Sequence, residues 1–167
     1  MFRPLLGWAT AWSFDALKLW LEKGLHPRLL IRRTMTYWLV CFLFAFVWMY
    51  QGIFPKIIFS HPEEMKMLSA IIDSTGNSIA ILKVIGMLEI IFGIIWLFPV
   101  PKQKLFILHI FMLIALTIAA GFTNIVSFTE PFNPITLNVL LMGVSIVGYI
   151  NSFDLPSAKN CKRKRKG

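Results

Sequence analysis

The sequence predicts an all-α membrane protein: a polytopic four-helix bundle with both termini cytoplasmic, preceded by an amphipathic helix at the membrane interface. Three observations support this fold class. Hydrophobic residues make up 57% of the 167 residues and charged residues 15%, whereas soluble domains carry about 25% charged residues. Four segments have the length and apolarity that a bilayer crossing requires. Most of the positive charge lies near the two ends of the chain.

The same numbers exclude other classes of protein. A soluble domain of this size does not bury so large an apolar fraction in one core, and disorder requires low hydrophobicity. In a soluble protein, a net charge of +9 would favour nucleic-acid binding. Here the basic residues flank apolar segments, so we expect contact with the lipid bilayer and none with nucleic acid.

Residues 1–34 predict a cytoplasmic-side segment that lies along the membrane surface. Asp15, Lys18 and Glu22 recur at helical spacing, and tryptophan and leucine side chains cover the rest of the helix. No uninterrupted apolar stretch precedes a cleavage site of the A-x-A kind, which argues against a signal peptide. A helix that docks on a partner protein is the alternative that the sequence leaves open.

Residues 35–152 hold the predicted membrane domain. A helix needs about 20 predominantly apolar residues to cross the hydrocarbon core, and the predicted spans are residues 36–54, 79–98, 104–126 and 135–151. Pro55 directly follows the first run, where a residue without a backbone N–H is tolerated best. In the loop after it, the apolar spacing of residues 62–72 predicts a further short amphipathic helix.

Basic residues determine the predicted orientation. Six precede the first span and six lie in the tail of residues 153–167, whereas residues 127–133 contain none and carry Glu130. Positively charged flanks stay in the cytoplasm, so both termini are predicted inside. We expect the basic run of the tail to contact anionic lipid.

Each predicted span carries one stripe of more polar residues, and the simplest packing turns all four stripes inward. In chain order, the stripes are Tyr37, Cys41, Phe44, Trp48 and Gln51; Gly86, Glu89, Gly93 and Trp96; His109, Leu113 and Thr117; and Asn138, Met142, Ser145 and Tyr149. Polar groups in hydrocarbon are costly, so each of them needs a partner.

Glu89 is the strongest candidate for a functional residue. It lies near the middle of its span, where an ionisable group costs about 2.5–3.5 kcal/mol on insertion scales. We therefore expect Glu89 to be either protonated or paired with a cation, Lys83 or Lys56. Lys83 is awkwardly placed around the helix for direct pairing. The sequence leaves open whether Glu89 holds the helices together or handles a ligand or a proton.

Other polar residues are further ligand-binding or proton-handling candidates. Most fall toward the outer ends of the spans and one toward the inner end; they are Gln51, Lys56, Asn124, Asn133, Asn138 and, at the inner end, His109. A cavity that opens outward, with Glu89 as its floor, would use this distribution. The simpler interpretation is a set of interhelical hydrogen bonds worth about 0.6 kcal/mol each, with His109 as a satisfied buried histidine.

The sequence contains no motif for a metal, a haem or a flavin, and we assign no catalytic residue. The three histidines, His26, His61 and His109, lie at different levels of the predicted fold. Cys41 and Cys161 form no CxxC pair, so thiol chemistry has no support.

Three short motifs, in order, resemble the DoxX-like family of membrane proteins. They are residues 50–56 (YQGIFPK) followed by 61–64 (HPEE), residues 86–93 (GMLEIIFG) and residues 131–138 (PFNPITLN). The resemblance covers roughly residues 35–152. It implies a four-helix bundle in a bacterial cytoplasmic (inner) membrane, similar in architecture to EXPERA-type sterol isomerases and the vitamin K epoxide reductase bundle. It also implies relatives that are subunits of a thiosulfate:quinone oxidoreductase or linked to oxidative-stress complexes.

The resemblance and Glu89 together predict an accessory or ligand-binding component of a membrane redox system, without a redox centre or an independent catalytic activity. The predicted ligand is a quinone-like or other lipophilic molecule. The predicted partners are a membrane or redox protein and a second copy of the chain. Three alternatives stay open: a small proton-coupled transporter, an EXPERA-like lipid isomerase with Glu89 as acid or base, and a scaffold for another membrane protein.

Overall fold

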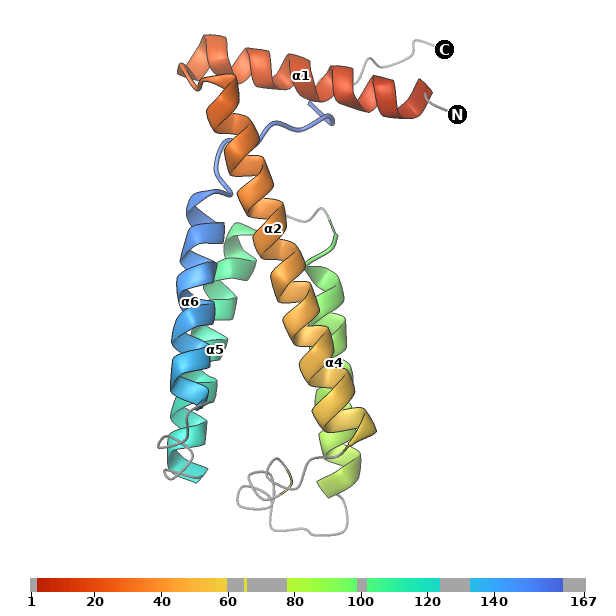
Figure 1. The fold of residues 1–167 in the computed structure, drawn as a ribbon, viewed down its shortest axis with the longest axis vertical. Helices are drawn as coiled ribbons and strands as arrows, with labels where there is room; N and C mark the ends of the chain where they lie inside the picture. Colours follow the sequence, from red (N-terminus) through yellow and green to blue (C-terminus); the bar gives the residue numbers. More distant parts are fainter. Residues whose placement is uncertain (1–2, 60–64, 66–77, 99–101, 124–132, 161–167) are drawn as a thin grey trace. The chain divides into compact units, whose positions relative to one another are not determined.

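The computed structural model describes residues 3–59, 65, 78–98, 102–123 and 133–160. Within these ranges the chain is helical apart from turns and short connections, and it contains no strand, which confirms the all-α prediction. The elements are α1 (Arg3–Lys23), α2 (Pro27–Gln51), the π-helix η1 (Gly52–Ile58), α4 (Ser78–Ile95), α5 (Gln103–Thr123) and α6 (Pro134–Ile150) (Figure 1). The short helix predicted for residues 62–72 and the basic run after residue 160 lie outside the described residues.

Three helical segments of the described chain are long and apolar enough to cross a membrane. The first joins α2 to η1 and runs for 32 residues, from Pro27 to Ile58. The second is α4, with 18 residues, and the third covers 20 residues of α5, Gln103–Phe122. The fourth predicted span is present as α6, whose apolar run Ile135–Ile150 is shorter than the others.

The first apolar helix begins earlier than the predicted residue 36. It starts at Pro27, and proline is favoured in a first helical turn because the missing N–H would have no partner there. Gly24, with a φ of 68°, ends α1, and its N–H donates to the Trp20 carbonyl at 2.9 Å. A left-handed glycine at this position is a common helix terminator.

The prediction that Pro55 ends the first span is wrong. The helix continues through Pro55 as η1, and the Phe59 N–H donates to the Phe54 carbonyl at 3.0 Å, five residues back. A π-helix has a wider turn than an α-helix, so the hydrogen-bond ladder is already altered where proline lacks a donor. The chain therefore passes the proline without leaving the helical path.

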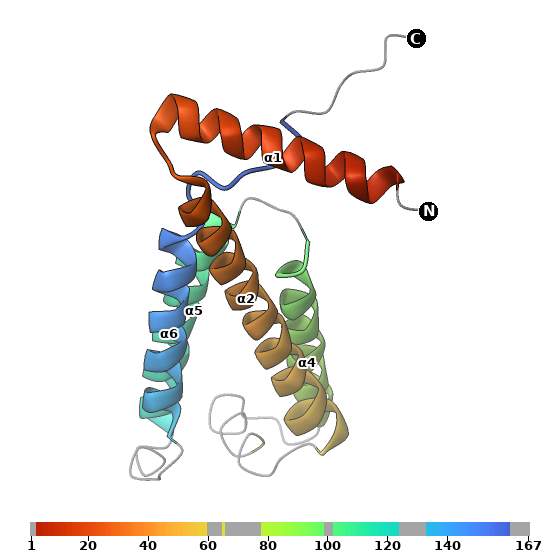
Figure 2. The same ribbon diagram turned by 45° about the horizontal axis from the view of Figure 1, so that its top comes forward.

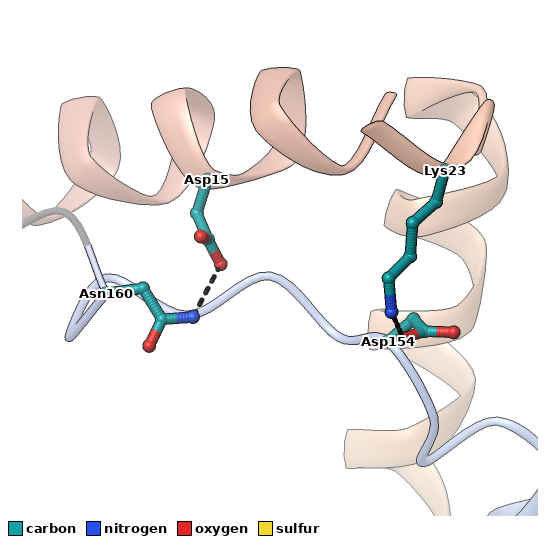
Figure 3. Close-up of polar contacts among 4 residues, drawn as sticks. All are labelled: Asp15, Lys23, Asp154 and Asn160. Carbon is teal, nitrogen blue, oxygen red and sulfur yellow. Dashed lines mark hydrogen bonds and ion pairs between the residues drawn. The ribbon is translucent and has the colours of Figure 1, made fainter. Parts of the chain in front are cut away.

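The chain forms two compact units, Leu39–Tyr149 and a unit made from both ends, Met1–Trp38 with Ile150–Gly167. In the terminal unit, residues that follow α6 lie along α1 (Figure 3). Asp15 Oδ2 accepts hydrogen bonds from the Ser157 N–H at 2.8 Å and from Asn160 Nδ2 at 3.1 Å. Lys23 forms an ion pair with Asp154. Asp15 is thus buried, rather than on an open polar face with Lys18 and Glu22 as its spacing suggested.

In the unit Leu39–Tyr149, α4 runs alongside η1 and the second half of α2, and α5 runs alongside α6 (Figures 1 and 2). The predicted inward stripes are largely buried; their buried members in this unit are Cys41, Phe44, Trp48, Gly86, Gly93, Trp96, His109, Leu113, Asn138 and Ser145. Large apolar side chains such as Phe46, Ile91 and Phe111 are exposed instead. This distribution suits helices whose outer faces contact lipid tails.

Aromatic rings form the centre of this unit. They come from α2, α4, α5 and the turn after α4, and they comprise Phe44, Trp48, Phe92, Trp96, Phe106 and the imidazole of His109. The ring centroids of Phe44 and Trp96 lie 4.9 Å apart, as do those of Trp96 and Phe106. The fourth helix, α6, contacts the cluster through Gly148, where a Cβ atom would collide with the Phe106 ring.

Candidate functional site

Glu89 of α4 and Lys56 of η1 form an ion pair between two apolar helical segments. Lys56 Nζ lies 2.9 Å from Glu89 Oε2, and the two side chains are only 13% and 15% exposed. Of the two cations that the sequence offered to Glu89, the structure uses Lys56, while Lys83 is exposed. We refer to Lys56 and Glu89 below as the charge pair.

Two glycines bring the backbones of η1 and α4 close enough for this contact. A Cβ atom on Gly52 would lie 2.5 Å from the Gly86 carbonyl oxygen, and one on Gly86 would lie 2.8 Å from the Gly52 carbonyl oxygen. Any larger residue would collide with rigid backbone. The motif residues Gly52 and Gly86 thus act as small contact residues between helices in an apolar environment.

The lysine reaches the carboxylate by lying along α4. A Cβ atom on Gly86 would meet Lys56 Cβ at 2.9 Å, so the Lys56 stem starts over Gly86. Glu89 follows Gly86 by three residues, which places it on nearly the same face one turn along the helix. The flexible methylene chain of Lys56 spans that turn and places the ammonium group against the carboxylate.

Surroundings of low polarity strengthen the attraction within such a pair and raise the energy of either charge alone. Loss of one partner therefore leaves the other charge buried and uncompensated. A polar ligand or a proton that binds at the pair can likewise change the balance between its two charges. Chemically, the pair offers a cationic donor and an anionic acceptor next to each other in an apolar setting.

His109 belongs to a different polar network, which joins three helices. Trp48 Nε1 donates to His109 Nε2 at 3.0 Å, and His109 Nδ1 lies 2.7 Å from Ser145 Oγ. Ser145 Oγ donates to the Leu141 carbonyl at 2.8 Å, so its single proton is used there. The imidazole then accepts at Nε2 and donates from Nδ1, which assigns one proton to the ring. His109 is fully buried and satisfied, as in the simpler of the two interpretations of the sequence.

The amide candidates fall into separate roles. Asn138 Nδ2 donates to Thr117 Oγ1 at 2.8 Å and joins α6 to α5. Asn133 precedes α6, and its Oδ1 accepts from the Thr136 N–H at 2.8 Å. This is helix N-capping, with Pro134 at the first helical position, and an Asn-Pro pair is a local pattern that favours such a helix start. Gln51 is half-buried at the α2–η1 junction, and Asn124 lies outside the described residues.

Lys102 is a buried polar residue that the sequence did not single out. It precedes α5, is 2% exposed and donates from Nζ to the Trp96 carbonyl. Burial lowers the pKa of Lys102, and the neighbouring Cys41 thiol, which hydrogen-bonds it, partly opposes that shift. It lies in a short connection next to another lysine, Lys104, and nothing in the local sequence indicates burial.

The structure thus brings Glu89 and Lys56 together and places His109, Asn138 and Asn133 in contacts of their own. Among the residues that the structure describes, no group of three or more His, Cys, Asp or Glu side chains is arranged to hold a metal ion. The charge pair is therefore the candidate site that the geometry favours.

Comparison with known proteins places the chain among membrane proteins. Residues 45–146 match the sequence profile of the DoxX-like family. Over 166 residues, the chain is 37% identical to YndG of Bacillus subtilis (strain 168), which is described as an uncharacterized membrane protein. That match covers 99% of this chain and 49% of YndG, so the chain spans about half the length of this relative. No solved structure matches the chain.

Proposed function

Because the chain belongs to the DoxX-like family of membrane proteins, we propose that it binds a lipophilic molecule with a carbonyl head group, such as a quinone, at the charge pair. In this proposal it is an accessory subunit of a membrane redox system, and a partner protein supplies the electrons. The observation that carries the proposal is the contact of 2.9 Å between Lys56 Nζ and Glu89 Oε2 inside apolar helices.

The chemistry of the pair suits such a ligand. A lysine ammonium has three N–H donors and no acceptor, so it can donate to a ligand carbonyl while it remains next to a carboxylate. The carboxylate can take up a proton when a ligand changes the charge balance around it. Reducible carbonyl compounds exchange protons along with electrons, and Glu89 would hold or release that proton.

The proposal includes a topology. We propose that α2 with η1, α4, α5 and α6 cross a bacterial cytoplasmic membrane as a four-helix bundle, with both chain ends inside. The burial of one stripe on each helix and the basic residues near both ends support this arrangement. The outer faces of the bundle remain available for a partner protein or a second copy of the chain.

Photolabelling tests the ligand assignment. The purified protein in nanodiscs is irradiated with an azido-quinone, and the labelled peptides are identified by mass spectrometry with and without excess unmodified quinone. We expect competable labelling on peptides that contain η1 and α4, with less labelling in Lys56→Met and Glu89→Gln. The matched control is Lys83→Met, which removes an exposed lysine from α4 and should label like the wild type. Labelling that survives competition, or that both pair variants leave unchanged, would contradict the proposal.

A small proton-coupled transporter is the second candidate, because one proton on the carboxylate would neutralise half of an intramembrane ion pair. Proton flux in proteoliposomes separates the two functions. Flux that disappears in Glu89→Gln and persists in Lys83→Met would favour transport over ligand binding. The isomerase alternative is weaker, because His109, another proton-handling candidate of the sequence, uses both ring nitrogens in its own network.

A further inference from the structure

The net charge of the chain lies entirely in the terminal unit. Residues 1–38 and 150–167 contain twelve Lys and Arg against three Asp and Glu, while residues 39–149 contain five of each. The terminal unit therefore carries the whole net charge of +9 and the other unit none. A surface with this excess is attracted to anionic partners.

The residues that follow α6 cover one side of α1. We call residues 154–160 the strap. Asp15, the buried acidic residue of α1, binds the strap through Ser157 and Asn160 (Figure 3). Ala11 and Ala16 of α1 are buried as well, and so is Ala158 of the strap. The described hydrogen bonds between Asp15 and the strap thus lie on the Asp15 side of α1.

The opposite side of α1 is exposed and apolar. Residues 6, 10, 13, 17 and 21 follow helical spacing on this side, about half a turn around the helix from Asp15. Leu6, Leu17 and Leu21 are 64%, 42% and 77% exposed. We call this side the outer face of α1.

Two hydroxyl groups interrupt the outer face in sequence, but their hydrogen-bonding capacity is used locally. Thr10 Oγ1 donates to the Leu6 carbonyl at 2.8 Å, and Ser13 Oγ donates to the Ala9 carbonyl at 2.9 Å. Both residues therefore direct their donors back to the helix backbone. The outer face presents no hydroxyl proton to a hydrogen-bonding partner, which suits contact with acyl chains.

We propose that the outer face of α1 inserts into the headgroup region of an anionic lipid leaflet, with the basic residues that the structure describes in the terminal unit contacting lipid phosphates. A lipid surface satisfies both observations at once, because it offers acyl chains to the leucines and negative charge to the net +9. The strap leaves this face open because its contacts are on the other side of α1. The terminal unit is thus an anionic-lipid binding module, distinct from the charge pair.

Spin labelling of the full-length protein tests this proposal. Cys41 and Cys161 are replaced by alanine and serine, and a nitroxide is attached to Leu17→Cys on the outer face or to Glu22→Cys, an exposed position on the Asp15 side of α1. Glu22→Cys also removes a negative charge, which favours attraction to anionic lipid, so nickel access at position 22 cannot be caused by weakened attraction. The protein is reconstituted in phosphatidylcholine vesicles with and without phosphatidylglycerol, and label accessibility to oxygen and to a water-soluble nickel chelate is measured.

We expect the label at position 17 to be accessible to oxygen and protected from nickel, and the label at position 22 to show the reverse. Protection at position 17 should increase with phosphatidylglycerol and decrease in high salt, because salt screens charge attraction. Nickel access at position 17 in both lipid mixtures would overturn the proposal and favour a protein partner. Equal protection in both mixtures would overturn its anionic-lipid assignment.

Discussion

At the scale of single residues, two acidic side chains show that a carboxylate can be buried when a cation or hydrogen-bond donors from another part of the chain contact it. Glu89 tolerates an apolar helix because Lys56 extends along α4 from Gly86 to meet it. Asp15 tolerates burial because a backbone N–H and an amide of the strap donate to it. The partners of both acids lie far from them in sequence. Spacing along one helix therefore offered two possible cations for Glu89 without choosing between them, and it suggested an exposed position for Asp15, which is buried.

Asp15→Ala should release the strap from α1. The substitution removes the acceptor for the Ser157 N–H and Asn160 Nδ2, and hydrogen bonds to a charged group contribute about 1.5–3 kcal/mol each. We expect faster amide hydrogen exchange over residues 154–160, with exchange in α5 unchanged. Glu22→Ala, which removes an exposed acid from the same helix, is the control. Unchanged protection of the strap in Asp15→Ala would show that these bonds do not hold it.

Lys102 should make stability depend on alkaline pH. Burial lowers its pKa below the usual 10.5 in the folded protein, so between the lowered value and 10.5 the unfolded chain binds more protons than the folded one. Stability therefore rises as pH increases through that window. We expect the thermal midpoint of the wild type, relative to that of Lys102→Met, to increase as pH rises toward 10.5. Lys104→Met removes an exposed lysine nearby, and its thermal midpoint should change with pH as that of the wild type does. If the midpoint of Lys102→Met also changes with pH as that of the wild type does, the lowered pKa of Lys102 is refuted.

At the scale of elements, η1 and α4 form the contact on which the charge pair depends. The π-helical turn carries Pro55 past the point where an α-helix would have ended, and it keeps Lys56 against α4. Sequence patterns did not reveal this, because proline normally marks a helix boundary and the π-helix has no strong residue signature. The stripe that contains Gly86 and Glu89 was predicted to turn inward, and Gly86 is buried as that prediction requires.

Gly86→Ala should separate η1 from α4. The added Cβ would lie 2.8 Å from the Gly52 carbonyl oxygen, and overpacking of this kind costs about 1–3 kcal/mol. Gly143→Ala, also within a helix but with nothing within 4 Å of the new Cβ, should be neutral or slightly stabilising. Thermal unfolding in nanodiscs compares the two variants. Equal midpoints for both would contradict the close approach of η1 and α4.

At the scale of the whole molecule, composition and periodicity were sufficient for the helical class and for the buried faces. Stripes such as Phe44 with Trp48, or Asn138 with Ser145, are buried as their spacing predicted. The sequence did not predict which side chain would contact which across helices. Trp48 contacts His109, and Lys56 contacts Glu89, only because of the way the helices pack. The joining of the two chain ends through Asp15 was equally invisible to local patterns.

The proposed orientation predicts where the second cysteine can be labelled. Cys41 is buried, so a membrane-impermeant maleimide should report on Cys161 in the tail. We expect labelling in inside-out membrane vesicles and none in intact spheroplasts, because the proposed orientation puts both chain ends in the cytoplasm. Cys161→Ser should abolish the signal. Labelling of Cys161 in intact spheroplasts would reverse the orientation.

Ligand binding at the charge pair requires Glu89 to be an ionised partner of Lys56 within the apolar helices. Infrared difference spectroscopy of wild type minus Glu89→Gln, in nanodiscs at neutral pH, reads this state directly. We expect the substitution to remove a carboxylate stretching band, and we expect the wild-type band to shift when Lys56→Met removes the cation. Loss of the carbonyl band of a protonated carboxylic acid, with no effect of Lys56→Met on it, would contradict the charge pair and the ligand site built on it.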